Sequence, residues 1–117
     1  MRLDLRRGRG LSGEGLAFGY LFALGYRPRE RNWRTRLGEV DLVMEDGPAI
    51  VFVEVKTRRG LGFGDGFAAV AGRKRARLRR LAEAYMRHHP DRACRIDVVS
   101  VTIVRGRPTI AHLVGAC

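Results

Sequence analysis

The segment AIVFVEVK, residues 49–56, constrains the fold of this chain more than any other. It reads as a β-strand, and side chains alternate between the two faces of a strand. One face therefore carries Ile50, Phe52, Glu54 and Lys56, and the other carries Val51, Val53 and Val55. Because both faces are largely apolar, both must be covered, as in the central strand of an α/β domain. A glutamate and a lysine then emerge near the carboxyl end of this strand, on the same face.

Helices and further strands that could cover this strand flank it in the sequence. Apolar residues at helical spacing predict helices from about Ser12 to Leu24 and from about Ala71 to His88. Strand-like patterns cover residues 26–33, 39–45, 96–104 and 109–113. The predicted order is α-β-β-β-α-β-β, a mixed central sheet flanked by helices in three layers. Residues 1–117 are expected to form one domain, with a flexible basic arm over residues 1–10 and a flexible glycine-rich loop over residues 57–66.

Two carboxylates are expected to meet across the hairpin that precedes Lys56. If Asp46-Gly47 is the two-residue loop, Asp41 lies diagonal to Glu54, with Cβ atoms on the order of 7 Å apart. A longer loop from Asp46 to Ala49 puts Asp41 directly opposite Glu54. Any even loop length keeps both carboxylates on one face, and an odd length separates them.

Such a pair predicts a site for a hard divalent cation. Mg²⁺ and Mn²⁺ bind one or two carboxylates together with waters and substrate phosphate. A bound ion lowers the pKa of its water and neutralises charge that develops on a phosphate. Lys56, beside Asp41 and Glu54, could orient or deprotonate that water or hold the phosphate. These residues are the parts required for phosphodiester hydrolysis.

The charge balance points to a polyanionic partner. Lys and Arg number 23 against 12 Asp and Glu, which gives a net charge of +11. DNA, RNA or an anionic membrane surface would satisfy this charge. No apolar run is long enough to span a membrane, and the basic segment MRLDLRRGRG, which no apolar stretch follows, is not expected to act as a signal peptide. The two cysteines form no CxxC motif, so a cytoplasmic location is expected.

Only two of the cationic residues are lysines, Lys56 and Lys74. Lys74 lies on the apolar stripe of the second helix, where it either extends to solvent or points toward the carboxylates and contacts phosphate. Arg58 and Arg59 directly follow the strand and are candidate phosphate ligands. A further stripe could follow a nucleic-acid backbone or simply be a solvated helix face; it comprises Arg73, Arg77, Arg80 and Arg87.

Asp41 followed by Glu54-Val55-Lys56 resembles the D…(D/E)-x-K signature of the restriction-endonuclease-like superfamily. Over roughly residues 12–104 the chain is similar to the small YraN-like family, which is related to archaeal Holliday-junction resolvases. The matching segments are GEG at 13–15, RNWR at 31–34, GEVDLV at 38–43, FVEVKTR at 52–58, Lys74 and RIDVV at 95–99. In the full form of the superfamily signature a proline directly precedes the aspartate, whereas Val40 precedes Asp41 in this chain.

The resemblance implies a restriction-endonuclease-like fold with Glu14, Asp41, Glu54 and Lys56 at the active site. Asp41 and Glu54 would hold Mg²⁺ or Mn²⁺, with the Val55 carbonyl as a third ligand, and Lys56 would position the attacking water. The expected activity is DNA hydrolysis, with branched DNA as substrate and a homodimer as the form that supplies two sites. The alternatives are a nucleic-acid-binding protein without useful catalysis and an RNA-directed nuclease.

Overall fold

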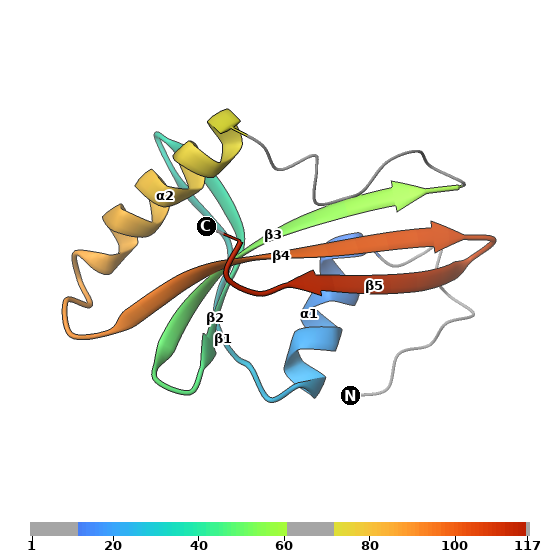
Figure 1. The fold of residues 1–117 in the computed structure, drawn as a ribbon, viewed down its shortest axis with the longest axis horizontal. Helices are drawn as coiled ribbons and strands as arrows, with labels where there is room; N and C mark the ends of the chain where they lie inside the picture. The colour runs from blue at the N-terminus through green and yellow to red at the C-terminus, as the bar shows by residue number, and fades with distance from the viewer. Residues whose placement is uncertain (1–11, 61–71, 117) are drawn as a thin grey trace.

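The computed structural model describes residues 12–60 and 72–116, which form five strands and two helices (Figure 1). The elements are α1 (Gly13–Ala23), β1 (Arg27–Thr35), β2 (Gly38–Asp46), β3 (Ala49–Arg59), α2 (Gly72–Met86), β4 (Ala93–Val104) and β5 (Arg107–Leu113). Ser12 caps α1 as its sequence suggests, accepting a hydrogen bond of 2.9 Å from the Gly15 amide. The predicted order α-β-β-β-α-β-β is confirmed.

The five strands form one mixed sheet in the order β1-β2-β3-β4-β5. β3 and β4 run parallel and are connected through α2, whereas the other neighbours are antiparallel. β1 and β5 are therefore the two edge strands. The second residue of each is a proline, Pro28 in β1 and Pro108 in β5. The AIVFVEVK segment lies inside the sheet, as its two apolar faces require.

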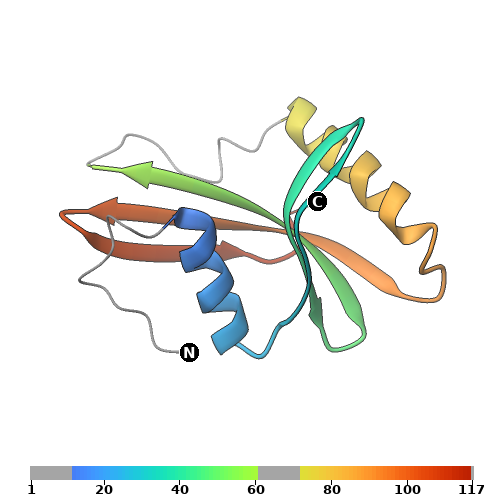
Figure 2. The same cartoon turned by 180° about the vertical axis from the view of Figure 1, so that it is seen from behind.

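Each face of the sheet is covered by one helix. α1 lies behind the sheet in Figure 1 and in front of it in Figure 2. Leu16, Ala17 and Leu21 of α1 pack with Val51 and Val53 of β3. On the other face, the α2 residues Leu78, Leu81, Ala82 and Tyr85 pack with Ile50 and Phe52. The alternation predicted for β3 is confirmed. Neither described helix is long and apolar enough to cross a membrane.

The β2–β3 register settles which hairpin pairing occurs. Asp46 pairs with Ala49 and Leu42 pairs with Val53, so the loop residues are Gly47 and Pro48 rather than Asp46 and Gly47. Gly47 has φ +57°, the left-handed conformation that such a tight loop requires. Continued by one residue, this register places Asp41 opposite Glu54. The loop length is even, as a shared face for the two carboxylates requires, and the pairing itself ends at Leu42 and Val53, one residue short of them.

Several element boundaries differ from the sequence expectation. Residues 57–59, expected in a flexible loop, extend β3 because they pair with β4 as far as Arg59 and Ile103. β5 begins at Arg107, since the turn needs only Arg105 and Gly106, both with positive φ. The expected basic arm, residues 1–10, and most of the glycine-rich segment lie outside the described residues.

A buried ionic network fastens the C-terminal part of the sheet. The fully buried Asp97 of β4 accepts hydrogen bonds from Arg95 Nε (2.9 Å) and the Gly115 amide (3.0 Å), and lies 2.7 Å from His112 Nε2. Arg95 also donates to Asp46 Oδ2 at 2.9 Å. Because a buried carboxylate needs such partners, the network holds β5 and the C-terminal turn against β4.

Candidate metal and phosphate site

The candidate site lies beside the middle and carboxyl half of β3, where the pairing of β3 with β2 ends and where α1 and α2 approach from opposite faces of the sheet. α1 docks there by its first residue: a Cβ placed on Gly13 would lie 1.7 Å from Thr57 Oγ1. Only glycine permits this close approach of helix and strand. The contact brings Glu14, in the first turn of α1, to the same end of β3 as Lys56.

Asp41 of β2 takes part in the sheet through its side chain. The β2–β3 pairing ends at Leu42 and Val53, and beyond it the backbone N–H of Val55 donates to Asp41 Oδ2 at 2.8 Å. Burial raises the pKa of Asp41 to about 6 against the lowering effect of the Val55 hydrogen bond, and nearby Glu54, Glu14 and Glu39 add to the rise. Glu54, Glu14 and Glu39 are therefore close enough to Asp41 to disfavour its charged form.

Glu54 is the most buried of these acids, with its side chain 7 % exposed. Its Oε1 atom forms an ion pair with Lys74 Nζ of α2, and Lys56 Nζ lies 3.7 Å from the same oxygen. Of the two orientations open to Lys74 from its position in the sequence, the structure therefore shows the one that points to the carboxylates. Both lysines of the chain lie beside Glu54.

The two lysines influence each other's protonation in opposite directions. The pKa of Lys56 is lowered, mainly by the hydrogen bond between Lys56 and Lys74 and secondly by burial. The negative charges of Glu54 and Asp41 act in the opposite direction. Burial also acts to lower the pKa of Lys74, but hydrogen bonds to Glu54 and Lys56 outweigh burial and raise it. Lys56 is consequently the lysine that more readily gives up its proton.

Asn32 of β1 also belongs to this region, and sequence reasoning missed it. Its Nδ2 donates to Glu14 Oε2 at 3.1 Å and to Glu39 Oε1 at 2.8 Å. Its φ of +52° lies in the left-handed region, which asparagine tolerates better than most residues. The only available signal was the asparagine within RNWR, a residue type that suits such a strained position.

The expected phosphate-binding cations are spread over two elements. Arg58 is two residues from Lys56 and so shares its face of β3, whereas the exposed Arg59 lies on the opposite face. On α2, a shallow groove of about 380 Å³ is lined by Lys74, Ala76, Arg77 and Arg80. The side chain of Arg73 lies outside the described part of the structure. The groove places positive charge directly beside the lysine that contacts Glu54.

The donor set is compatible with Mg²⁺ or Mn²⁺, which bind one or two carboxylates and complete their shell with water. Asp41 and Glu54 supply two such carboxylates. Among residues 12–60 and 72–116, no group of three or more His, Cys, Asp or Glu side chains could hold a metal ion. The described side chains therefore do not form a zinc site built from protein ligands alone.

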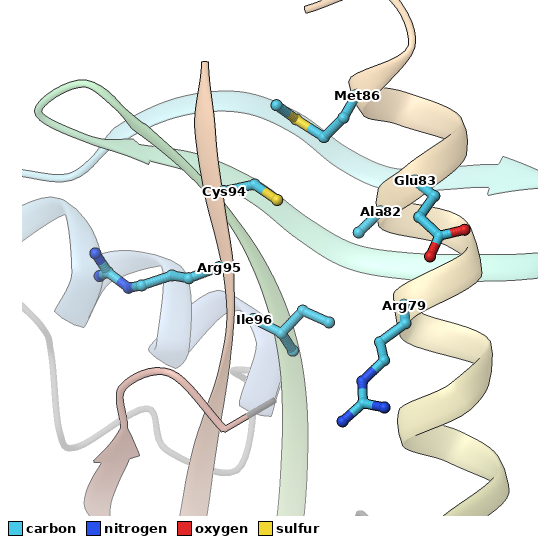
Figure 3. Close-up of a pocket in the computed structure, with 7 residues that line it drawn as sticks. All are labelled: Arg79, Ala82, Glu83, Met86, Cys94, Arg95 and Ile96. Carbon is cyan, nitrogen blue, oxygen red and sulfur yellow. The ribbon is translucent and has the colours of Figure 1, made fainter. Parts of the chain in front are cut away.

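A second cavity, of about 330 Å³, lies between α2 and the beginning of β4 (Figure 3). Its lining combines Ala82, Met86 and Ile96 with polar side chains, and the free thiol of Cys94 opens onto it. β4 pairs these residues with the amino-terminal half of β3, because Cys94 lies opposite Ile50 and Ile96 lies opposite Phe52. None of the site residues expected from the sequence lines this cavity.

Comparison with known proteins agrees with the resemblance seen in the motifs. The model of the uncharacterised protein family UPF0102 matches residues 13–101, which include all the described elements of the candidate site. A UPF0102 protein from Clavibacter michiganensis is 48% identical over 111 residues, covering 92% of this chain and 94% of its own. A UPF0102 protein from Streptomyces griseus is 46% identical over 117 residues, covering 97% and 98%. A third, from Moorella thermoacetica, is 50% identical over 102 residues, covering 86% and 85%. This chain belongs to the UPF0102 family, to which the name YraN also refers.

Proposed function

We propose that this protein is a metal-dependent endonuclease that hydrolyses phosphodiester bonds in DNA, with branched DNA as its preferred substrate. The observation that carries the proposal is the grouping of Asp41 and Glu54 with both lysines of an otherwise arginine-based cationic surface. A structural ion pair needs only one carboxylate and one cation, whereas here two carboxylates and two lysines are grouped. The preference for branched DNA rests on the resemblance to Holliday-junction resolvases.

In this proposal the chain's own groups divide the work. Asp41 and Glu54, with the Val55 carbonyl, hold Mg²⁺ or Mn²⁺, which supplies an acidified water and neutralises charge on the phosphate when bound. Lys56, whose pKa is lowered by Lys74 and by burial, accepts a proton from the attacking water or orients it. Glu14 accepts a hydrogen bond from Asn32 and is thereby held among the carboxylates that surround Asp41.

The cations beyond the carboxylates would hold the nucleic acid. Arg58 on β3 and the α2 groove with Arg77 and Arg80 would contact the phosphates that flank the scissile bond. Arg59, on the opposite face, would contact a phosphate farther along the strand. Such contacts are independent of base sequence, so the substrate would be selected by its shape.

The test is cleavage of labelled branched, flapped and linear DNA in Mn²⁺ by wild type, Asp41→Ala and Glu54→Ala. Both variants should lose roughly 100-fold or more of the rate, because each removes charge stabilisation at the reacting phosphate. Asp46→Asn is the matched control, since this acid of β2 pairs with Arg95 at the other end of the strand.

Equal cleavage by wild type and both alanine variants would contradict the assignment of the site. If no DNA is cleaved but salt-sensitive binding persists in both variants, the protein is a nucleic-acid-binding module of the same fold. Preferential cleavage of RNA in a parallel assay would identify the alternative RNA-directed nuclease.

A further inference from the structure

Both lysines of this chain converge on one oxygen atom. Lys74 Nζ forms an ion pair with Glu54 Oε1, and Lys56 Nζ lies 3.7 Å from that oxygen. The remaining Lys and Arg residues, of 23 in all, are arginines. They include Arg73 and Arg75 on either side of Lys74 in the sequence. Lysine is therefore used only where a cation faces Glu54.

The difference between the two cations has a physical consequence at this oxygen. Arginine binds a carboxylate through a planar, two-point fork that is geometrically demanding. A lysine ammonium is a compact point charge on a flexible side chain. It can therefore contact a single carboxylate oxygen and can leave that oxygen by a change of rotamer. An ammonium group beside Glu54 Oε1 is therefore more easily displaced by another cation than a guanidinium group would be.

The proposed metal would bind the same carboxylate group that Lys74 contacts. Glu54 is nearly buried, and its Oε1 atom already contacts one cation and lies close to a second. A divalent ion coordinated by this carboxylate would add two positive charges close to the Lys74 ammonium. Repulsion between the ion and the Lys74 ammonium in this partly buried place would be strong.

We propose that Lys74 and the divalent metal compete for Glu54, so that Lys74 neutralises the metal-free site and is released when the ion binds. This rests on the proposed function, because it takes Asp41 and Glu54 as the metal ligands. Lys74 is then a positioning residue rather than a metal ligand.

The structure also provides a place for the released side chain. Lys74 itself lines the groove of about 380 Å³ that Arg77 and Arg80 border. An ammonium that leaves Glu54 would enter this groove and add one positive charge to a phosphate-binding surface. Metal and nucleic acid would then strengthen each other's binding, because each favours the released position of Lys74.

The composition of the chain allows this to be observed directly. Protein labelled with ¹³C and ¹⁵N in lysine gives only two side-chain ammonium signals, which Lys74→Arg assigns. Saturating Mg²⁺ should move the Lys74 signal toward the position it takes in Glu54→Gln without metal, since both changes break the same ion pair. A Lys74 signal that stays in place in Mg²⁺-saturated protein would overturn the proposal.

Metal affinity provides a second, independent measurement. The dissociation constant for Mn²⁺, from the electron paramagnetic resonance of the free ion, should fall by about fivefold or more in Lys74→Met. Arg79→Met removes the same charge from the solvent-exposed side of α2 and should change it by less than about twofold.

The outcomes separate this proposal from the proposed function. Mn²⁺ binding that is lost in Asp41→Asn but equal in Lys74→Met and Arg79→Met would overturn the competition and leave the metal site intact. Absence of Mn²⁺ binding in wild type and Lys74→Met alike would overturn both. Binding that appears only in Lys74→Met would support competition in which Lys74 prevails.

Discussion

The Asp41 carboxyl group is subject to two opposing influences. The Val55 amide donates to it and favours its charged form, whereas burial and the neighbouring acids favour its neutral form and prevail. The resulting pKa of about 6 lies above the ordinary value of 3.8. The folded protein therefore binds a proton at Asp41 more tightly than the unfolded chain does.

This pKa predicts how stability depends on pH. The contribution of Asp41 is fully present below pH 3.8 and is lost as pH rises through about 6, so the ionised group destabilises the metal-free fold at pH 8. Asp41→Asn, which still accepts from Val55, should therefore raise the free energy of unfolding at pH 8 by about 1–2 kcal/mol, after allowance for partial solvent screening. It should have little effect near pH 3.5. Urea unfolding at both pH values measures the difference.

Glu45 is the matched control for Asp41. Hydrogen bonds and ion pairs with Arg92 and Arg29, opposed by burial, lower the pKa of Glu45, so its contribution has the opposite sign. Glu45→Gln should lower stability at pH 8, with the loss disappearing as pH falls below the ordinary glutamate pKa. A destabilised Asp41→Asn at pH 8 would contradict the assignment of burial as the dominant influence on Asp41.

How far single residues can be predicted depends on whether they follow a repeating pattern. Alternation along β3 placed Glu54 and Lys56 on one face without knowledge of the fold. Lys74 was left with two orientations, because a helical position does not specify whether a flexible side chain extends to solvent or contacts a neighbouring strand. Asn32 could not be predicted, since its role depends on a left-handed backbone and on two acids from different elements.

At the scale of elements, the position of α1 depends on one missing side chain. A Cβ on Gly13 would lie 1.7 Å from Thr57 Oγ1 and 2.8 Å from Thr57 Cβ, so helix and strand would have to separate. Glu14 would move with the helix. The same contact thus determines how α1 packs against β3 and where Glu14 lies relative to Asp41.

Gly13→Ala should lower the free energy of unfolding by about 1–3 kcal/mol, because overpacking outweighs the better helix propensity of alanine. Denaturant unfolding measures this change, and Thr57→Gly combined with Gly13→Ala should lose less than the sum of the single variants. Gly15→Ala is the control, since its added Cβ would meet only the Ser12 hydroxyl within 4 Å, at 3.1 Å. Additive losses for positions 13 and 57 would contradict the contact.

Element types and order were predictable because each depends on local periodicity, whereas boundaries depend on partners. β3 continues to Arg59 only because β4 is long enough to pair with it. The hairpin register was left between two pairings, one with Asp46-Gly47 as a two-residue loop and one with a longer loop from Asp46 to Ala49, because the sequence alone does not specify how far the two strands pair. The carboxylate arrangement was predictable to the extent that both pairings place Asp41 and Glu54 on one face.

At the scale of the whole molecule, the net charge of +11 favours binding to nucleic acid that weakens as the salt concentration rises. If five cations each neutralise one phosphate of a duplex, the logarithm of the association constant should fall with the logarithm of salt concentration with a slope of about −4.5. The five are Arg58, Arg59, Lys74, Arg77 and Arg80. Fluorescence anisotropy at several salt concentrations measures the slope.

Arg77→Gln should make this slope shallower by about 0.9, and Arg79→Gln, outside the groove, should leave it unchanged. Binding that does not depend on salt would contradict the phosphate contacts. Equal slopes for Arg77→Gln and Arg79→Gln would instead contradict the placement of those contacts in the groove.

The two edge strands of the sheet, β1 and β5, influence whether copies of this protein aggregate at high concentration. β1 carries Pro28, an irregular register between Pro28 and Glu30, and several arginines, and β5 begins with Arg107-Pro108. A proline removes a backbone donor, and like charges repel at close approach, so neither margin is a good template for an added strand. Sheets of different molecules should therefore resist joining edge to edge into aggregates.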